Sequence, residues 1–343
     1  MTRGSILNVA IALITAVAVA AAYRGSIVVA PLTLGLFMIA LVWPMQEALQ
    51  RRIPALVALF VTMTVTVAIM LAFASLLVWG FGRVGRSAIA NAGRYQAMLD
   101  TAVAWLDGHD ISIAGLWAQY FNLAWMLRWA QQITGHLNAT LSFWLFTLVY
   151  MVLGLMEVGD LRRRVEAYLE PRSAHVLLVA TADVAHKFRQ YMVVRTQMSL
   201  ATGALVAAFA WVAGLHLAVE WGVIAFTLNY IPFLGPFVAT LFPTLLAMTQ
   251  FATWTKVLGI FMCLNLIQFI IGSYVEPRVS GNVLGISPTV VLFVVIFWTF
   301  LWGLYGAFIG VPIAIAALTF CKHYPSTEWI AGLFGGPLRA KRG

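Results

Sequence analysis

Residues 229–237 read NYIPFLGPF, a stretch with an asparagine, two prolines and a glycine. It lies inside a run from Trp221 to Thr255 that contains no Asp, Glu, Lys or Arg. Helix interiors avoid proline, because proline lacks the amide hydrogen and its ring clashes with the preceding turn. The stretch therefore predicts either a segment that is not a membrane-spanning helix or a membrane helix that is interrupted.

The composition indicates a membrane protein. Hydrophobic residues make up 62% of the chain and charged residues 10%, whereas about a quarter of the residues in soluble domains are charged. A helix of about 20 residues crosses a hydrocarbon core about 30 Å thick and satisfies its own backbone hydrogen bonds. Eight uncharged runs reach at least 18 residues: 4–23, 25–46, 53–82, 129–156, 196–219, 221–255, 257–275 and 279–321. We therefore expect an all-α polytopic membrane protein with about eight transmembrane helices, some broken or re-entrant, and with amphipathic surface helices.

The positions of the charged residues divide the chain into six expected parts. The start could be read as a signal peptide, but a second apolar run follows after only Arg24, and a tight helical hairpin fits better. For the second part, an interfacial helix and a small packed helical cap stay open as alternatives. The parts are three transmembrane helices in 1–82, an external amphipathic segment in 83–128, a fourth transmembrane helix in 129–156, a cytoplasmic amphipathic linker in 157–195, a core with broken helices in 196–320, and a cytoplasmic tail in 321–343.

The basic residues predict the orientation. Most Lys and Arg fall in one alternating set of loops, which includes both termini and 157–195. The positive-inside rule then places both termini in the cytoplasm. The formal net charge of +9 fits basic cytoplasmic loops, so we expect a lipid bilayer and no nucleic acid as partner. Within 157–195 we expect two helices on the headgroups, separated at Pro171.

Motifs for nucleotide binding or catalysis are missing from the sequence. It contains no GxxxxGK[ST] phosphate loop, no HExxH and no GxSxG, and its six histidines do not cluster. The two cysteines, Cys263 and Cys321, lie in apolar runs and do not suggest a disulfide framework. We therefore expect no cofactor, no metal site and no enzymatic activity.

Helix breakers and polar groups coincide at three places of apparent membrane depth: 229–243, 264–288 and 303–312. Transporters use discontinuous helices to build solute sites, with helix ends and unwound backbone facing the substrate. The alternative is a kinked or re-entrant helix whose neighbours restore the lost hydrogen bonds. Whether 221–248 and 289–320 are single bent spans or re-entrant hairpins stays open.

The second and third places hold further candidate residues. Asn265 and Gln268 are three residues apart and share a helix face, where amides bond either a neighbouring helix or a polar solute. Glu276 and Arg278 flank Pro277; turned inward, Glu276 is a natural proton or cation site, and turned outward the two form an exposed loop pair. Gly306 and Gly310 have the GxxxG spacing that favours close helix packing.

These residues carry a resemblance to a known family. The C-terminal part, about 196–320, resembles the autoinducer-2 exporter (AI-2E) family of bacterial membrane proteins. It shares Asn-x-Ile-Pro-x-x-Gly-Pro, a Glu-Pro pair after a polar helix, Leu-Gly-x-x-Pro, and a late Gly-x-x-Gly followed by proline. Gln197 resembles a glutamine that members often carry there. The matching positions are Asn229, Pro232, Gly235, Pro236, Glu276, Pro277, Leu284, Gly285, Pro288, Gly303, Gly306 and Pro312.

The resemblance implies a multi-pass protein of the bacterial inner membrane that exports a small polar molecule such as autoinducer-2, a quorum-sensing signal. It implies eight spans, cytoplasmic termini and assembly into a homo-oligomer. Some members resemble sodium or lithium/proton antiporters, so a monovalent cation is the alternative substrate. A scaffold or assembly protein, acting through 83–128 and 157–195, is the alternative from another class.

Overall fold

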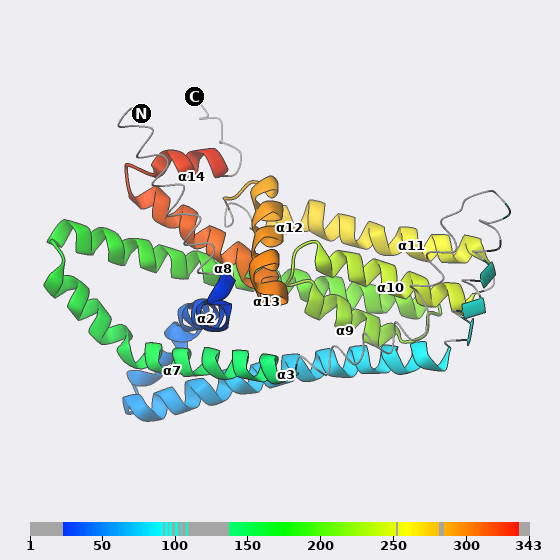
Figure 1. Ribbon diagram of the computed structural model, residues 1–343, viewed down its shortest axis with the longest axis horizontal. Helices are drawn as coiled ribbons and strands as arrows, with labels where there is room; N and C mark the ends of the chain where they lie inside the picture. The colour runs from blue at the N-terminus through cyan, green and yellow to red at the C-terminus, as the bar shows by residue number, and fades with distance from the viewer. Residues whose placement is uncertain are drawn as a thin grey trace. The chain divides into compact units, whose positions relative to one another are not determined.

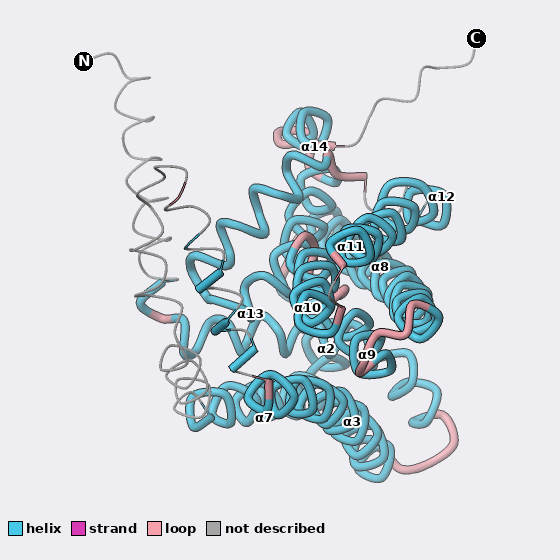
Figure 2. Tube along the Cα trace, turned by 90° about the vertical axis from the view of Figure 1, so that its right-hand side faces the viewer, coloured by secondary structure: helices cyan, strands magenta, loops and turns pink. Residues whose placement is uncertain are grey.

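The computed structural model describes residues 23–91, 137–251, 253–280 and 285–335, with scattered positions between 93 and 108. Figure 1 shows its helices in chain order. Among the described residues there is no strand (Figure 2), and the one β-bridge joins Ile286 to Gly335. Residues 4–22 of the expected span 4–23, most of the segment 83–128, and Leu284 of the family motif lie outside the described residues.

The described helices confirm the predicted class, a polytopic all-α membrane protein. Six stretches of them are long and apolar enough to cross a membrane. These are α2, α3, α7, α8, α13 and the continuous helix formed by α11, η1 and α12; α9 and α10 are shorter apolar helices. The expected number of eight spans stays a prediction. The bounds are α2 Ser26–Gln50, α3 Ala55–Ala90, α7 Leu137–Tyr168, α8 Pro171–Val212, α9 Ala218–Leu228, α10 Leu234–Gln250, α11 Trp254–Phe269, the π-helix η1 Ile270–Val275, α12 Glu276–Ser280, α13 Pro288–His323 and α14 Glu328–Phe334.

The chain forms two compact units. One comprises Met1–Val67, Ser142–Val193 and Ser280–Gly343, and the other comprises Ala68–Leu141 and Val194–Val279. The chain passes from one to the other within α3, α7, α8 and α12. We call them unit 1 and unit 2 and describe each by itself.

The segment 157–195 forms the end of α7 and the beginning of α8 and contains no separate surface helices. The predicted break at Pro171 is confirmed, because α7 ends at Tyr168 and α8 starts at Pro171. Proline disfavours helical geometry in the residue before it and is well tolerated at the first position of a helix. In the same way, α3 continues past the expected limit at residue 82 as far as Ala90.

Unit 2 has a core of α8, α9, α10 and α11. Its fully buried side chains include Val206, Ile224 and Leu264. A Cβ atom at Gly203 on α8 would lie 2.7 Å from the carbonyl oxygen of Gly222 on α9. Small residues let helix backbones approach closely where the hydrophobic effect cannot hold helices together. The Gly203–Gly222 contact therefore fixes α9 tightly against α8.

Helices α9 and α10 form a hairpin. They lie side by side (Figure 1), and Gln250 at the end of α10 closes the base. Its Oε1 accepts from the backbone N–H of His216 at 2.9 Å, and its Nε2 donates to the carbonyl of Gly214 at 2.6 Å. The 11 residues of α9 span only about 16 Å. Residues 218–250 are therefore a hairpin whose two ends meet. For the expected segment 221–248, the structure thus shows a hairpin and not a single bent span.

Unit 1 contains a second reversal inside α13. Gly303 has φ 61° and ψ −141°, a conformation that glycine adopts without strain. Beyond it, a Cβ atom at Gly310 would lie 3.0 Å from the carbonyl oxygen of Val294, and one at Gly306 would overlap the carbonyl of Trp298. In a straight helix residues 294 and 310 would be about 24 Å apart. The two arms of α13, which meet at its label in Figure 1, therefore form a hairpin as well.

The core of unit 1 packs around this second hairpin. Leu301, Trp302 and Ile309 of α13 are buried, and they pack with apolar side chains of α2 and α7. Phe143 of α7 stacks on Tyr305 of α13 with ring centroids 3.7 Å apart. Gly306, Gly310 and Pro312 are buried in the second arm, so the GxxxG spacing serves contact between the two arms of one helix.

Candidate functional site

The turn between α9 and α10 explains why the stretch 229–237 is so rich in helix breakers. Phe233 has φ 65° and ψ −43°, and Leu234 N donates to Pro232 O at 2.8 Å, which makes a rare and strained three-residue turn. A Cβ atom at Gly235 would lie 2.5 Å from the carbonyl oxygen of Leu228, so only glycine fits there. Pro236 lies in the first turn of α10, where backbone N–H groups have no partner within the helix. The turn is therefore a sharp hairpin tip.

Helix α8 holds this tip through two polar contacts. Asn229 Nδ2 donates to Ser199 Oγ at 3.3 Å, and the Tyr230 hydroxyl donates to Thr196 Oγ1 at 3.0 Å. Asn229 is 6% exposed and Ser199 is fully buried. Residues 196 and 199 are three apart and share one face of α8. The hairpin tip is thus fixed by hydroxyl and amide groups within an otherwise apolar helix.

The same face of α8 carries an ion pair one turn earlier. Arg195 Nη1 lies 2.9 Å from Glu276 Oε1, and the two side chains are only 9% and 20% exposed. Glu276 is the first residue after the π-helix η1. Single turns of π-helix are rare in proteins, and those that occur are often located at functional sites. The second predicted break therefore ends on a carboxylate that α8 binds directly.

The six residues Arg195, Thr196, Ser199, Asn229, Tyr230 and Glu276 make up what we call the α8 polar cluster. Because Arg195 and Ser199 are four residues apart, their Cβ atoms lie about 5–6 Å from each other, so the ion pair and the tip contacts are neighbours. An ionisable side chain in a membrane helix costs about 2.5–3.5 kcal/mol on insertion scales and usually marks a functional site. The cluster offers a polar molecule hydroxyl, amide and carboxylate groups in one place.

Comparisons with known proteins agree with this architecture. The model of the AI-2E family transporter matches residues 9–326. The chain belongs to the AI-2E transporter family. The AI-2 transport protein TqsA of Escherichia coli (strain K12) is 28% identical over 298 residues, which cover 84% of this chain and 83% of TqsA. A putative transport protein of Borreliella burgdorferi is 29% identical over 50% of this chain, and the putative transport protein YhhT of Escherichia coli (strain K12) is 28% identical over 55%.

The last two matches cover 47% and 51% of those relatives. Membership of the AI-2E family confirms the resemblance seen in the sequence and supports a role as a multi-pass membrane transporter. The names of the relatives establish neither the substrate of this chain nor its direction of transport.

Two of the AI-2E motif residues belong to the α8 polar cluster, Asn229 and Glu276. Pro232, Gly235 and Pro236 shape the tip that presents Asn229. Gln197 lies on α8 next to the cluster, but its side chain is exposed. Gly306, Gly310 and Pro312 belong to the second hairpin and thus to unit 1.

The remaining candidates lie around the π-helix. Asn265 Nδ2 donates to Phe261 O at 2.8 Å within its own helix, whereas Gln268 Nε2 is buried without a partner among the described residues. The Arg278 guanidinium donates to the Tyr274 hydroxyl at 2.7 Å and stacks on its ring. Pro277 is exposed. These side chains take no part in the contacts that define the cluster.

Four cluster residues were missed in the sequence: Arg195, Thr196, Ser199 and Tyr230. Arg195 was assigned to the cytoplasmic linker because it follows other basic residues, and α8 runs on through that boundary. A signal was present nonetheless, since residues 195 and 199 have the four-residue spacing of one helix face and lead into an apolar run.

Proposed function

We propose that this AI-2E family transporter exports a small polar molecule, autoinducer-2 or a related metabolite, and that the α8 polar cluster binds it. The observation that carries the proposal is the contact of Asn229 with Ser199, two buried polar groups from the hairpin tip and from α8. A polar solute that leaves water requires replacement hydrogen bonds. The name of the relative TqsA, an AI-2 transport protein, supports autoinducer-2 as the first solute to test.

The charge of the cluster favours a neutral solute over a cation. Glu276 is its only carboxylate, and Arg195 already binds that group at 2.9 Å. A sodium or lithium ion bound there must displace Arg195 or share the carboxylate with it. A neutral molecule with several oxygens pairs with the amide and hydroxyl groups and leaves the ion pair intact.

The cellular setting that we propose follows from the loops and the family. The protein lies in the bacterial inner membrane with both termini in the cytoplasm, and it assembles as a homo-oligomer. It works as a secondary transporter or facilitator, since the sequence contains no phosphate loop for ATP. Transport out of the cell then runs down the gradient of a metabolite made inside it.

The second candidate function is a Na⁺(Li⁺)/H⁺ antiporter, and the observation that favours it is the half-buried carboxylate of Glu276 beside the π-helix. One experiment separates the two functions. Purified protein is reconstituted into liposomes, and two signals are followed: efflux of labelled autoinducer-2 and internal pH after addition of a sodium or lithium gradient. Solute efflux without proton flux supports the exporter, and cation-dependent proton flux without solute efflux supports the antiporter.

Asn229→Ala tests whether the cluster binds the solute. Loss of one good hydrogen bond, about 1.4 kcal/mol, corresponds to about a tenfold loss of affinity, so we expect solute efflux to fall by about that factor. Asn265→Ala is the matched control, because among the described residues the Asn265 amide bonds a carbonyl of its own helix and no residue of the cluster. Equal efflux by the two variants would contradict a role of the hairpin tip in binding.

A further inference from the structure

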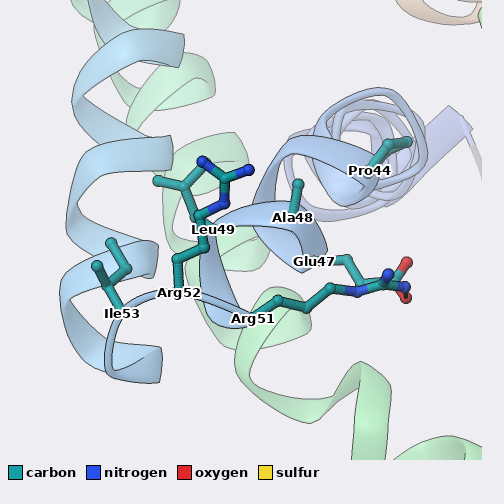
Figure 3. A pocket seen from close by; sticks show the side chains of 7 residues that line it. All are labelled: Pro44, Glu47, Ala48, Leu49, Arg51, Arg52 and Ile53. Carbon is teal, nitrogen blue, oxygen red and sulfur yellow. Dashed lines mark hydrogen bonds and ion pairs between the residues drawn. The ribbon is translucent and has the colours of Figure 1, made fainter.

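The turn between α2 and α3 borders a pocket that the transport proposal does not use. Its volume is about 650 Å³. Figure 3 shows the side chains that line it, all from the end of α2 and the turn that follows. They are Pro44, Glu47, Ala48, Leu49, Arg51, Arg52 and Ile53.

The two arginines of this pocket differ in their partners. Arg51 Nη2 lies 2.9 Å from Glu47 Oε1, so its charge is compensated. Arg52 points to the other side of the turn, alongside Leu49 (Figure 3). Among the described residues, no ion pair or hydrogen bond of the Arg52 side chain is present. The pocket therefore carries one positive charge without a counter-charge.

The other walls of the pocket are apolar and lie at the end of a membrane helix. Pro44, Ala48, Leu49 and Ile53 contribute hydrocarbon surface. Helix α2 has 25 residues and is apolar enough to cross a membrane, so its C-terminal end lies at the level of the lipid headgroups. An occupant that fits has one negative charge and an apolar part.

We propose that this pocket binds the phosphate of an anionic phospholipid, with Arg52 as its cationic partner. Basic pockets next to transmembrane helices on the cytoplasmic side are suited to lipid headgroups, and each basic residue near the membrane surface contributes about 1 kcal/mol to anionic lipid binding. The apolar wall formed by Leu49 and Ile53 distinguishes a lipid from free phosphate, because only the lipid has glycerol and acyl carbons to place there.

The test measures thermal unfolding of the full chain in neutral detergent with added phosphatidylglycerol, phosphatidylcholine or inorganic phosphate. A ligand that binds only the folded state raises the melting temperature with its concentration. We expect phosphatidylglycerol to raise it and the other two to leave it unchanged. Arg52→Gln weakens the apparent affinity for phosphatidylglycerol by about fivefold or more, and Arg52→Lys retains part of it.

The matched control is Arg164→Gln, which removes one positive charge from an exposed residue of α7 outside the pocket and should retain the full phosphatidylglycerol effect. Equal weakening by Arg52→Gln and Arg164→Gln would show a general charge effect and overturn the site. An equal rise with inorganic phosphate would identify a free anion as the occupant and overturn the lipid assignment. No response of the wild-type chain to phosphatidylglycerol would overturn the proposal directly.

Discussion

Arg195 and Glu276 form the ion pair on which the α8 polar cluster depends, and their burial sets its energetics. Removing one partner of a buried pair is strongly destabilising, by about 3–5 kcal/mol, because the other charge stays buried without compensation. We therefore expect Arg195→Gln to lower the melting temperature markedly. The double variant Arg195→Gln/Glu276→Gln should recover most of the loss, since no unpaired charge remains.

The control for this pair is Arg162→Gln, which breaks the exposed Arg162–Glu166 contact. Exposed ion pairs contribute about 0–1 kcal/mol, so its melting temperature should stay close to that of the wild type. A double variant that is no more stable than Arg195→Gln would show that the destabilisation has another cause than the unpaired carboxylate.

Gln46 of α2 presents the opposite situation, a buried polar side chain without a partner. It is fully buried, and neither its Oε1 nor its Nε2 has a hydrogen-bond partner within the described residues. An unsatisfied buried polar group costs about 1–3 kcal/mol. Gln46→Leu, of similar volume, should therefore raise the melting temperature. A drop on this substitution would indicate that Gln46 bonds a buried water or a group outside the described residues.

At the scale of single residues, the sequence predicted which polar residues belong to the site better than it predicted which residues they contact. Asn229 and Glu276 stood out because a polar residue between helix breakers is conspicuous in an apolar run. Ser199 and Thr196 did not, because hydroxyl residues are common in membrane helices and often bond their own backbone, as Thr202 does with Met198 O. Only the folded structure shows that α8 turns these hydroxyls toward the hairpin tip.

At the scale of elements, the hairpin of α9 and α10 depends on a turn that tolerates no side chain at residue 235. A Cβ atom there would lie 2.5 Å from Leu228 O and 2.7 Å from Asn229 Cα. Gly235→Ala should therefore displace the tip, lower the melting temperature and reduce solute transport. Gly259→Ala on α11 is the control, since a Cβ atom at residue 259 meets nothing within 4 Å. Similar behaviour of the two variants would contradict the tight turn.

The sequence does not distinguish a hairpin from a single bent helix, and the reason is physical. A run of apolar residues with a proline has the same composition whether the helix bends or reverses, because either form buries it in lipid or protein. The decision lies in particular contacts: the bonds of Gln250 to residues 214 and 216, and the positive φ of Gly303. In contrast, the break before Pro171 was predictable, because proline constrains its own neighbour.

At the scale of the whole molecule, the hairpins change the expected path through the membrane. We expect the described helices α2, α3, α7, α8 and the continuous helix of α11, η1 and α12 to cross the membrane, and each hairpin to enter and leave on one side. The hairpin of α9 and α10 places residues 213–217 and residues 251 and 253 on one face, where a single bent span would place them on opposite faces.

Cysteine labelling tests this path. His216→Cys and Thr253→Cys are introduced separately into a variant in which Cys263 and Cys321 are replaced by alanine, and both sites are exposed. We expect a membrane-impermeant maleimide to label both from the same side of the membrane. Labelling from opposite sides would show that residues 218–250 cross as one bent span.

The most direct test of the central claim, that the α8 polar cluster carries the solute, is solute transport by Glu276→Gln. Gln keeps the shape of the side chain but removes the charge that holds Arg195, so the cluster loses the ion pair on which it depends. The measurement is efflux of labelled autoinducer-2 from liposomes that contain equal amounts of folded protein, with Glu166→Gln in the exposed pair as the control. We predict a strongly reduced rate for Glu276→Gln and an unchanged rate for Glu166→Gln. A wild-type rate from correctly folded Glu276→Gln protein would contradict the role assigned to the cluster.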